Sequence, residues 1–169
     1  IGGSVEPIIR AWGQGRRRAT LHAAKGGRFG FIARGGAHIV AVETCPILAP
    51  ALIAGLPALK QLGALFAPQR GDLNLQVLAT ESGLDVNIKG AGKVAAFAGA
   101  AISEAAAIAE AHDLARLSFD GEPLVLRRVP ILAMGAARVA PPPGAFVQPT
   151  REGEDVLARL TMEALAGAT

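Results

Sequence analysis

The sequence predicts an α+β fold: an antiparallel sheet built of hairpins, with two main helices packed on one face and a further helix at the C-terminal end. Glycine-containing turns separate pairs of short β-type runs, and the segments between these pairs have apolar residues at helical spacing. Strands joined by such tight turns run antiparallel. The order hairpin, helix, hairpin, helix, hairpin therefore excludes the βαβ alternation of a doubly wound fold.

The first part of the chain is expected to form a linker or edge segment followed by a hairpin. In the linker, residues 1–15, glycine and proline alternate with isolated apolar residues. Three β-type runs follow, at residues 18–25, 28–34 and 37–42. The pairs Gly26-Gly27 and Gly35-Gly36 separate these runs, and glycine pairs in this position are typical of hairpin turns.

Residues 46–65 predict the first helix. Five leucines lie at the spacing of one helix face: Leu48, Leu52, Leu56, Leu59 and Leu62. Pro50 suits the start of a helix, because the amides of the first turn have no partner within the helix. Pro57 falls in the interior, where its ring disturbs the helix, so we expect one break.

The second and third hairpins flank the second helix. Residues 72–80 and 84–89 alternate apolar and polar side chains around the turn Glu81-Ser82-Gly83. Residues 93–112 carry an apolar stripe at helical spacing: Val94, Phe97, Ala101, Ala105 and Ile108. The turn dipeptide Asp120-Gly121 joins residues 114–119 to 123–129, and residues 130–139 are expected to add one more strand.

The run Pro141-Pro142-Pro143-Gly144 interrupts regular structure and predicts a domain boundary. We expect a central α+β domain at residues 16–140 and a separate segment at residues 141–169, which starts a neighbouring domain. Its helix should cover residues 151–166, with Thr150 as the N-cap. Acidic side chains lie in its positive first turn: Glu152, Glu154 and Asp155.

The composition is that of an ordinary globular protein, since 51% of the 169 residues are hydrophobic and 18% are charged. One cysteine, Cys45, excludes an internal disulfide and a metal centre built only from the thiolates of this chain. Prolines or glutamates interrupt the two long apolar stretches, residues 45–67 and 94–111. We therefore expect core helices, no contact with a membrane, and a cytoplasmic location.

Positive charge is concentrated near the N-terminus. The net charge is +3, yet the first 34 residues contain seven basic residues and one acidic residue. The arginine guanidinium group binds phosphate in a bidentate manner, so a polyanionic partner such as RNA is one interpretation. The candidate RNA-binding residues are Arg16, Arg17, Arg18, Arg28 and Arg34. A basic face that is merely solvated is the alternative interpretation.

Other local patterns assign no chemistry. The stretch Gly90-Ala91-Gly92-Lys93-Val94 lacks the first glycine and the Ser or Thr of a phosphate-binding loop. The three histidines are scattered without the spacing of metal ligands: His22, His38 and His112. Residue spacing alone therefore identifies no catalytic residue.

Five segments, taken in order, resemble the motifs of a single enzyme family. Arg16-Arg17-Arg18-Ala19-Thr20 resembles the arginine-rich strand that opens the central domain of that family. The segment Cys45-Pro46-Ile47-Leu48-Ala49-Pro50 resembles its Cys-Pro-aliphatic helix start. Gly83-Leu84-Asp85-Val86 and Asp120-Gly121-Glu122 fall where that domain has hairpins. Phe146-Val147-Gln148-Pro149-Thr150 resembles its Phe-x-Gln-x-Asn signature, with Thr150 in place of the asparagine. The family that these five segments resemble is the RNA (uracil-5-)-methyltransferases, which use S-adenosylmethionine.

The resemblance implies a function and several residue roles. The full-length protein would transfer a methyl group from S-adenosylmethionine to C5 of a uridine in tRNA or rRNA. The position of Cys45 supplies one ligand of a four-iron four-sulfur cluster in the members that carry one. Phe146 and Gln148 would lie beside the flipped target uridine.

The resemblance places the other cluster ligands, the cofactor loop and the catalytic groups outside these residues. We therefore expect this chain to be an RNA-contacting fragment that is inactive alone, without iron or S-adenosylmethionine. Apolar surface left by missing neighbours is expected to favour a dimer. One alternative is a stand-alone nucleic-acid-binding or scaffolding module with no enzymatic activity. Another is a structural domain whose arginines only reflect a biased genome.

Overall fold

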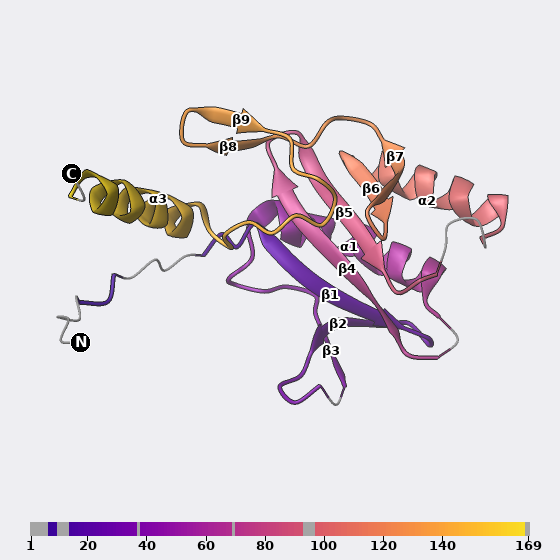
Figure 1. The fold of residues 1–169 in the computed structure, drawn as a ribbon. Coiled ribbons are helices and arrows are strands. Elements are labelled where there is room, and N and C mark those ends of the chain that lie inside the picture. Colours follow the sequence, from indigo (N-terminus) through magenta and orange to yellow (C-terminus); the bar gives the residue numbers. More distant parts are fainter. Residues whose placement is uncertain (1–6, 10–13, 37, 69, 93–96, 168–169) are drawn as a thin grey trace.

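The computed structural model describes residues 7–9, 14–36, 38–68, 70–92 and 97–167, and shows a mixed α+β fold (Figure 1). In chain order its elements are β1 (Arg18–Ala24), β2 (Arg28–Ile32), β3 (Ile39–Ala41), α1 (Pro50–Phe66), β4 (Asp72–Thr80), β5 (Gly83–Lys89), α2 (Gly99–Ala111), β6 (Arg116–Phe119), β7 (Glu122–Leu126), β8 (Leu132–Met134), β9 (Ala137–Val139) and α3 (Arg151–Ala166). The predicted fold class is confirmed. None of the helices in the described ranges is long and apolar enough to cross a membrane.

The main sheet has seven strands in the order β3-β2-β1-β4-β5-β6-β7. Every neighbouring pair is antiparallel except β5 and β6, which run parallel. Parallel neighbours need a crossover connection, and α2 lies within the connection between these two strands. The expectation of a purely antiparallel sheet is therefore wrong at this one pair, because the helix returns the chain to the starting end of β5.

Helix α1 covers one face of the sheet and contacts β1, β2, β4, β5 and α2. Side chains along each strand alternate between the two faces of the sheet. Leu21, Leu75 and Val86 are fully buried under the helices, and their neighbours along each strand point to the opposite face. We call this opposite side the open face. The backbone of Gly63 lies close to the side chains of Ala23 and Leu75, so α1 packs tightly against the sheet.

Three expectations about individual elements need correction. Helix α1 runs through Pro57 without a break. Pro57 is exposed, so water can bond the carbonyl group that lacks its amide partner. Helix α2 begins at Gly99, and Phe97 precedes it, packed edge-on against Phe66 with ring centroids 4.8 Å apart. Val94 lies outside the described residues.

The third correction concerns residues 130–139. They form two strands, β8 and β9, in a separate small hairpin, rather than one strand added to the main sheet. Gly135 forms part of the turn with a φ of 58°, a conformation that glycine adopts at little cost. Gly135 is the only turn signal in this run, and an isolated glycine in a strand pattern is equally typical of a bulge.

Residues 140–149 cross the open face of the sheet as an irregular segment with one turn at Pro143 and Gly144, and we call this segment the strap (Figure 1). The carbonyl oxygen of Pro141 accepts a hydrogen bond from Arg116 on β6. Val147 is buried in a small apolar cluster with Leu78 of β4 and Leu132 of β8. The strap thus ties β6 and β4 together, and α3 follows it.

Candidate nucleic-acid interface

Arg16 and Arg18 lie together at the beginning of β1, beside a groove. The groove has a volume of about 440 Å³, and its walls include Arg16, Arg18, Phe31, Cys45, Ile47 and Pro149. The residues Arg16 and Leu48 form an isolated parallel bridge, which brings the loop before α1 alongside β1. Two guanidinium groups therefore line a groove with partly apolar walls, a combination that suits a phosphate backbone and its bases.

Phe146 lies at the surface of the strap beside Arg18. Its side chain is 70% exposed, which is unusual for a phenylalanine. The guanidinium carbon of Arg18 lies 5.2 Å from the centroid of the Phe146 ring, within the range of a cation–π interaction. Arg18 thus links the groove to an exposed aromatic face on which a planar base can stack.

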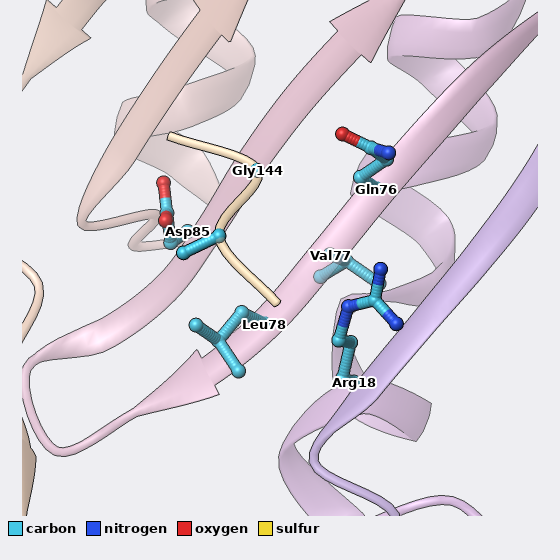
Figure 2. Close-up of a pocket in the computed structure, with 7 residues that line it drawn as sticks. Arg18, Gln76, Val77, Leu78, Asp85 and Gly144 are labelled. Carbon is cyan, nitrogen blue, oxygen red and sulfur yellow. The ribbon is translucent and has the colours of Figure 1, made fainter. Parts of the chain in front are cut away.

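The middle of the strap passes close to the sheet. Figure 2 shows the strap at Gly144 passing over the sheet near Asp85 and Leu78, and these three residues line a small cavity together with Arg18. A Cβ atom at Gly144 would lie 2.7 Å from both Asn87 Nδ2 and Gln76 Oε1. The glycine therefore allows the strap backbone to approach the sheet at Gln76 and Asn87.

Arg17 has a different environment from its two neighbours. It is 8% exposed, and its guanidinium group forms an ion pair with Glu154 in the first turn of α3. Its Nε donates to the carbonyl oxygen of Gln148 at 3.3 Å, and its backbone amide donates to Pro149. Arg17 joins β1 to the end of the strap, so we do not include it in the RNA-contacting surface. Three arginines in a row gave no signal of this difference.

The remaining predicted arginines lie away from this groove. Arg28 pairs across from Ala24, at the far end of β1 from Arg18. Six residues of β-strand separate these ends, which is about 20 Å. Arg28 and Arg34 are both exposed, and Arg28 Nε donates to the carbonyl oxygen of Lys25. The predicted arginines therefore mark two ends of a surface rather than one cluster.

Gln148 and Thr150 follow Phe146 at the start of α3. Gln148 is half-buried, and its backbone carbonyl is held by Arg17. Thr150 is the N-cap of α3, and its Oγ1 accepts a hydrogen bond from the amide of Gly153 at 3.1 Å. The predicted bounds of this helix and its cap are confirmed.

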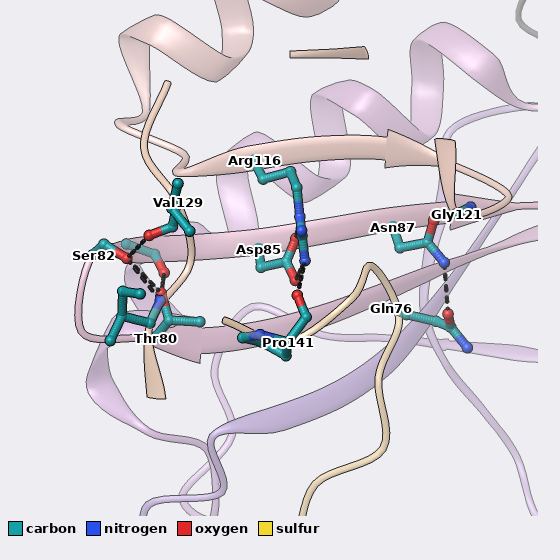
Figure 3. Close-up of polar contacts among 11 residues, drawn as sticks. Gln76, Thr80, Ser82, Asp85, Asn87, Arg116, Gly121, Val129 and Pro141 are labelled. Atoms are coloured by element: carbon teal, nitrogen blue, oxygen red, sulfur yellow. Dashed lines mark hydrogen bonds and ion pairs between the residues drawn. The ribbon is translucent and has the colours of Figure 1, made fainter. Parts of the chain in front are cut away.

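A buried polar network under the strap was not predicted. Arg116 and Asp85 form a two-bond ion pair, with N–O distances of 2.8 and 2.7 Å, and the same guanidinium group bonds Pro141 (Figure 3). Beside it, Asn87 Nδ2 donates to Gln76 Oε1 at 2.9 Å, and Asn87 Oδ1 accepts from the amide of Gly121. Alternation on β4, β5 and β6 was the available signal, because it places these polar side chains on one face.

Cys45 is half-buried in the wall of the groove. Within the described ranges there is no group of three or more His, Cys, Asp or Glu side chains that could hold a metal ion. One thiolate cannot complete the ligand shell of an iron–sulfur cluster. The described residues therefore do not form a cluster site by themselves, and Cys45 could supply at most one ligand.

Comparison with known proteins identifies relatives along nearly the whole chain, although no protein-family model matches it. The chain is 36% identical to an uncharacterised RNA methyltransferase of Brucella suis biovar 1, over 97% of this chain and 40% of that protein. It is also 36% identical to one from Caulobacter vibrioides, over 96% of this chain and 41% of the relative. One from Agrobacterium fabrum is 32% identical, over 88% of this chain and 36% of that relative. The chain is thus homologous to a segment of proteins named RNA methyltransferases, and it spans about two fifths of their length.

Proposed function

We propose that this chain is the RNA-contacting part of an RNA methyltransferase that transfers a methyl group from S-adenosylmethionine to C5 of a uridine in tRNA or rRNA. The names of its relatives support RNA methylation in general. The order of motifs from Arg16 to Thr150 supports the uridine C5 specificity, since it resembles that family in particular.

The observation that carries the proposal is the contact between Arg18 and the exposed Phe146 ring beside the groove. Single exposed apolar side chains are common on protein surfaces, and what distinguishes Phe146 is the guanidinium group of Arg18 over its ring beside the groove. An unpaired base that stacks on Phe146 would bring its phosphates to Arg16 and Arg18 at the rim of the groove. In this proposal Gln148, two residues further on, hydrogen-bonds the edge of the target base.

The proposal assigns no catalytic step to this chain. S-Adenosylmethionine supplies the methyl group in the full-length protein, and the residues named here hold and orient RNA. We predict that this chain alone binds RNA weakly, does not bind S-adenosylmethionine, and transfers no methyl group. Transfer of a methyl group by this chain alone would contradict this assignment.

RNA binding by variants of this chain tests the assignment. In fluorescence anisotropy with a labelled unpaired RNA, Phe146→Ala should weaken binding roughly tenfold, because it removes a stacking surface. Arg18→Ala should also weaken binding and lower the dependence of affinity on salt by about one phosphate contact.

Two matched controls keep the comparison specific. Leu126→Ala removes an exposed apolar side chain on β7, and Arg138→Ala removes an exposed arginine on β9. Neither should change RNA affinity. If the controls weaken binding as much as Arg18→Ala and Phe146→Ala do, RNA does not bind at the groove.

A further inference from the structure

The strap covers only part of the open face. Strand register places the open-face side chains in rows across the sheet, and two rows lie under or beside the strap. One contains Gln76 and Asn87, which hydrogen-bond to each other beside Gly144. The other contains Asp85 and Arg116, which pair beneath Pro141. These four side chains are hydrogen-bonded within the protein.

Among the described residues, no hydrogen bond joins the side chains of the next two rows to the strap. In the first, His22 of β1 lies opposite Asn74 of β4, and Asn74 lies opposite Lys89 of β5. In the second, Arg28 of β2 lies opposite Ala24, which lies opposite Asp72. We call the five polar side chains of these two rows the polar strip: His22, Arg28, Asp72, Asn74 and Lys89.

Two side chains of the polar strip, Asn74 and Arg28, have hydrogen-bonding groups that no described residue uses. Asn74 is half-buried and has no side-chain hydrogen bond within the described part of the chain, although Gln76 two residues later is paired. The terminal nitrogens of Arg28 have no partner there either, since only its Nε donates to a backbone carbonyl. An amide and a guanidinium group with free donors are the groups that recognise base edges and phosphates.

Charge in the polar strip favours an anionic partner. Arg28 and Lys89 are exposed cations. The one acid, Asp72, is engaged by His22 Nδ1 at 2.6 Å. Arg28 also lines a hollow of about 200 Å³ together with Asp72, His38, Gly36 and Gly71. The carboxylate of Asp72 thus shares this hollow with Arg28, and the two glycines leave room at its wall.

We propose that the polar strip binds a short unpaired stretch of RNA, with one phosphate at Arg28 in the hollow and a base edge hydrogen-bonded to Asn74. This inference rests on the proposed function and extends its RNA surface from the groove at Arg18 to the far end of β1. A single strand fits better than a duplex, because the amide of Asn74 is recessed in the sheet and can reach only the edges of unpaired bases.

The test uses this chain with a labelled unpaired RNA of twelve nucleotides and with the duplex of the same sequence. Asn74→Ala should weaken binding to the unpaired RNA roughly fivefold, the value of one hydrogen bond, with an unchanged salt dependence. Arg28→Ala should weaken binding and reduce the salt dependence by about one phosphate contact. Asn74→Ser, which keeps a small polar side chain, provides a second variant if the alanine variant unfolds.

Matched controls remove the same chemical groups elsewhere. Gln61→Ala removes an exposed amide on α1, and Arg138→Ala removes an exposed guanidinium group on β9. Neither should alter affinity. Equal affinity for the duplex, equal affinity for polyglutamate, or unchanged binding by both the Asn74 and Arg28 variants would overturn the inference. If the Asn74 and Arg28 variants bind RNA like the original chain while Arg18→Ala binds more weakly, the inference about the polar strip is overturned and the proposed function still holds.

Discussion

Neighbouring residues of the arginine run have different roles. Arg18 contacts an exposed aromatic ring, whereas Arg17 is buried against Glu154 and two strap carbonyls. The sequence predicted a basic segment here but not which arginine faces solvent. That distinction depends on α3 and the strap, more than a hundred residues away, so no local pattern contains it.

Gly144 offers a sharp test of how the strap is held. Its φ is 70°, and an added Cβ would meet two amides that are hydrogen-bonded to each other. Gly144→Ala should lower the free energy of unfolding by about 2 kcal/mol, from backbone strain and the collision together. Urea unfolding measures this.

Gly135→Ala is the matched control for that prediction. Gly135 has a φ of 58°, but no atom lies within 4 Å of its added Cβ. Gly135→Ala should therefore lower the free energy of unfolding only through backbone strain, by about 1 kcal/mol. Equal losses in the two variants would mean that the strap is not in close contact with Gln76 and Asn87.

Asp113 gives a pH-dependent prediction. Hydrogen bonds from Arg128 and then Arg127 hold the pKa of its carboxyl group below the usual value. Such a group stabilises the fold fully above its unfolded pKa, and the contribution is lost as the pH falls through the folded pKa, below about pH 4. Asp113→Asn should flatten the acid limb of the stability curve, measured by thermal unfolding across pH.

The effect at Asp113 should also depend on salt. Its side chain is 72% exposed, so dissolved ions screen the pair. Asparagine tolerates the φ of 52° at this position, which keeps backbone strain out of the comparison. An acid limb that is identical in both proteins at low salt would contradict the assignment.

Elements defined by local signals were predicted well, and those defined by distant contacts were not. The hairpin around Glu81-Ser82-Gly83 and the bounds of α3 follow from turn and cap residues within a few positions. The continuity of α1 through Pro57 depends on which side of the helix faces solvent. The parallel pairing of β5 and β6 depends on where α2 returns the chain. Neither of these two features can be predicted from a short stretch of sequence.

At the scale of elements, α3 depends on its cap more than on packing. None of its described side chains is buried, so apart from the ion pair between Glu154 and Arg17 tertiary contacts contribute little to its stability. Thr150→Ala should make the first-turn amides exchange with solvent roughly fivefold faster, since an N-cap contributes about 1 kcal/mol. Hydrogen–deuterium exchange measures this.

Thr161→Ala is the control for the cap. Thr161 lies on the same helix, and its hydroxyl donates to the carbonyl oxygen of Leu157 instead of capping an end. This variant should leave exchange in the first turn unchanged. If both threonine variants change it equally, Thr150 does not act as the cap.

At the scale of the molecule, the strap connects the candidate surface to the rest of the fold. It presents Phe146, covers Asp85 and Arg116, and leads directly to Thr150 and α3. The sequence predicted its glycine and prolines as a boundary between domains. The structure shows that these residues also lie against the sheet, which no composition shift could reveal.

The central proposal is that this chain belongs to an enzyme that methylates C5 of uridine in RNA. The most direct measurement is nucleoside mass spectrometry of tRNA and rRNA from cells with and without the gene that encodes this chain. The account predicts that 5-methyluridine disappears from one RNA position and returns when the gene is restored. An unchanged 5-methyluridine content in both RNA fractions would contradict it.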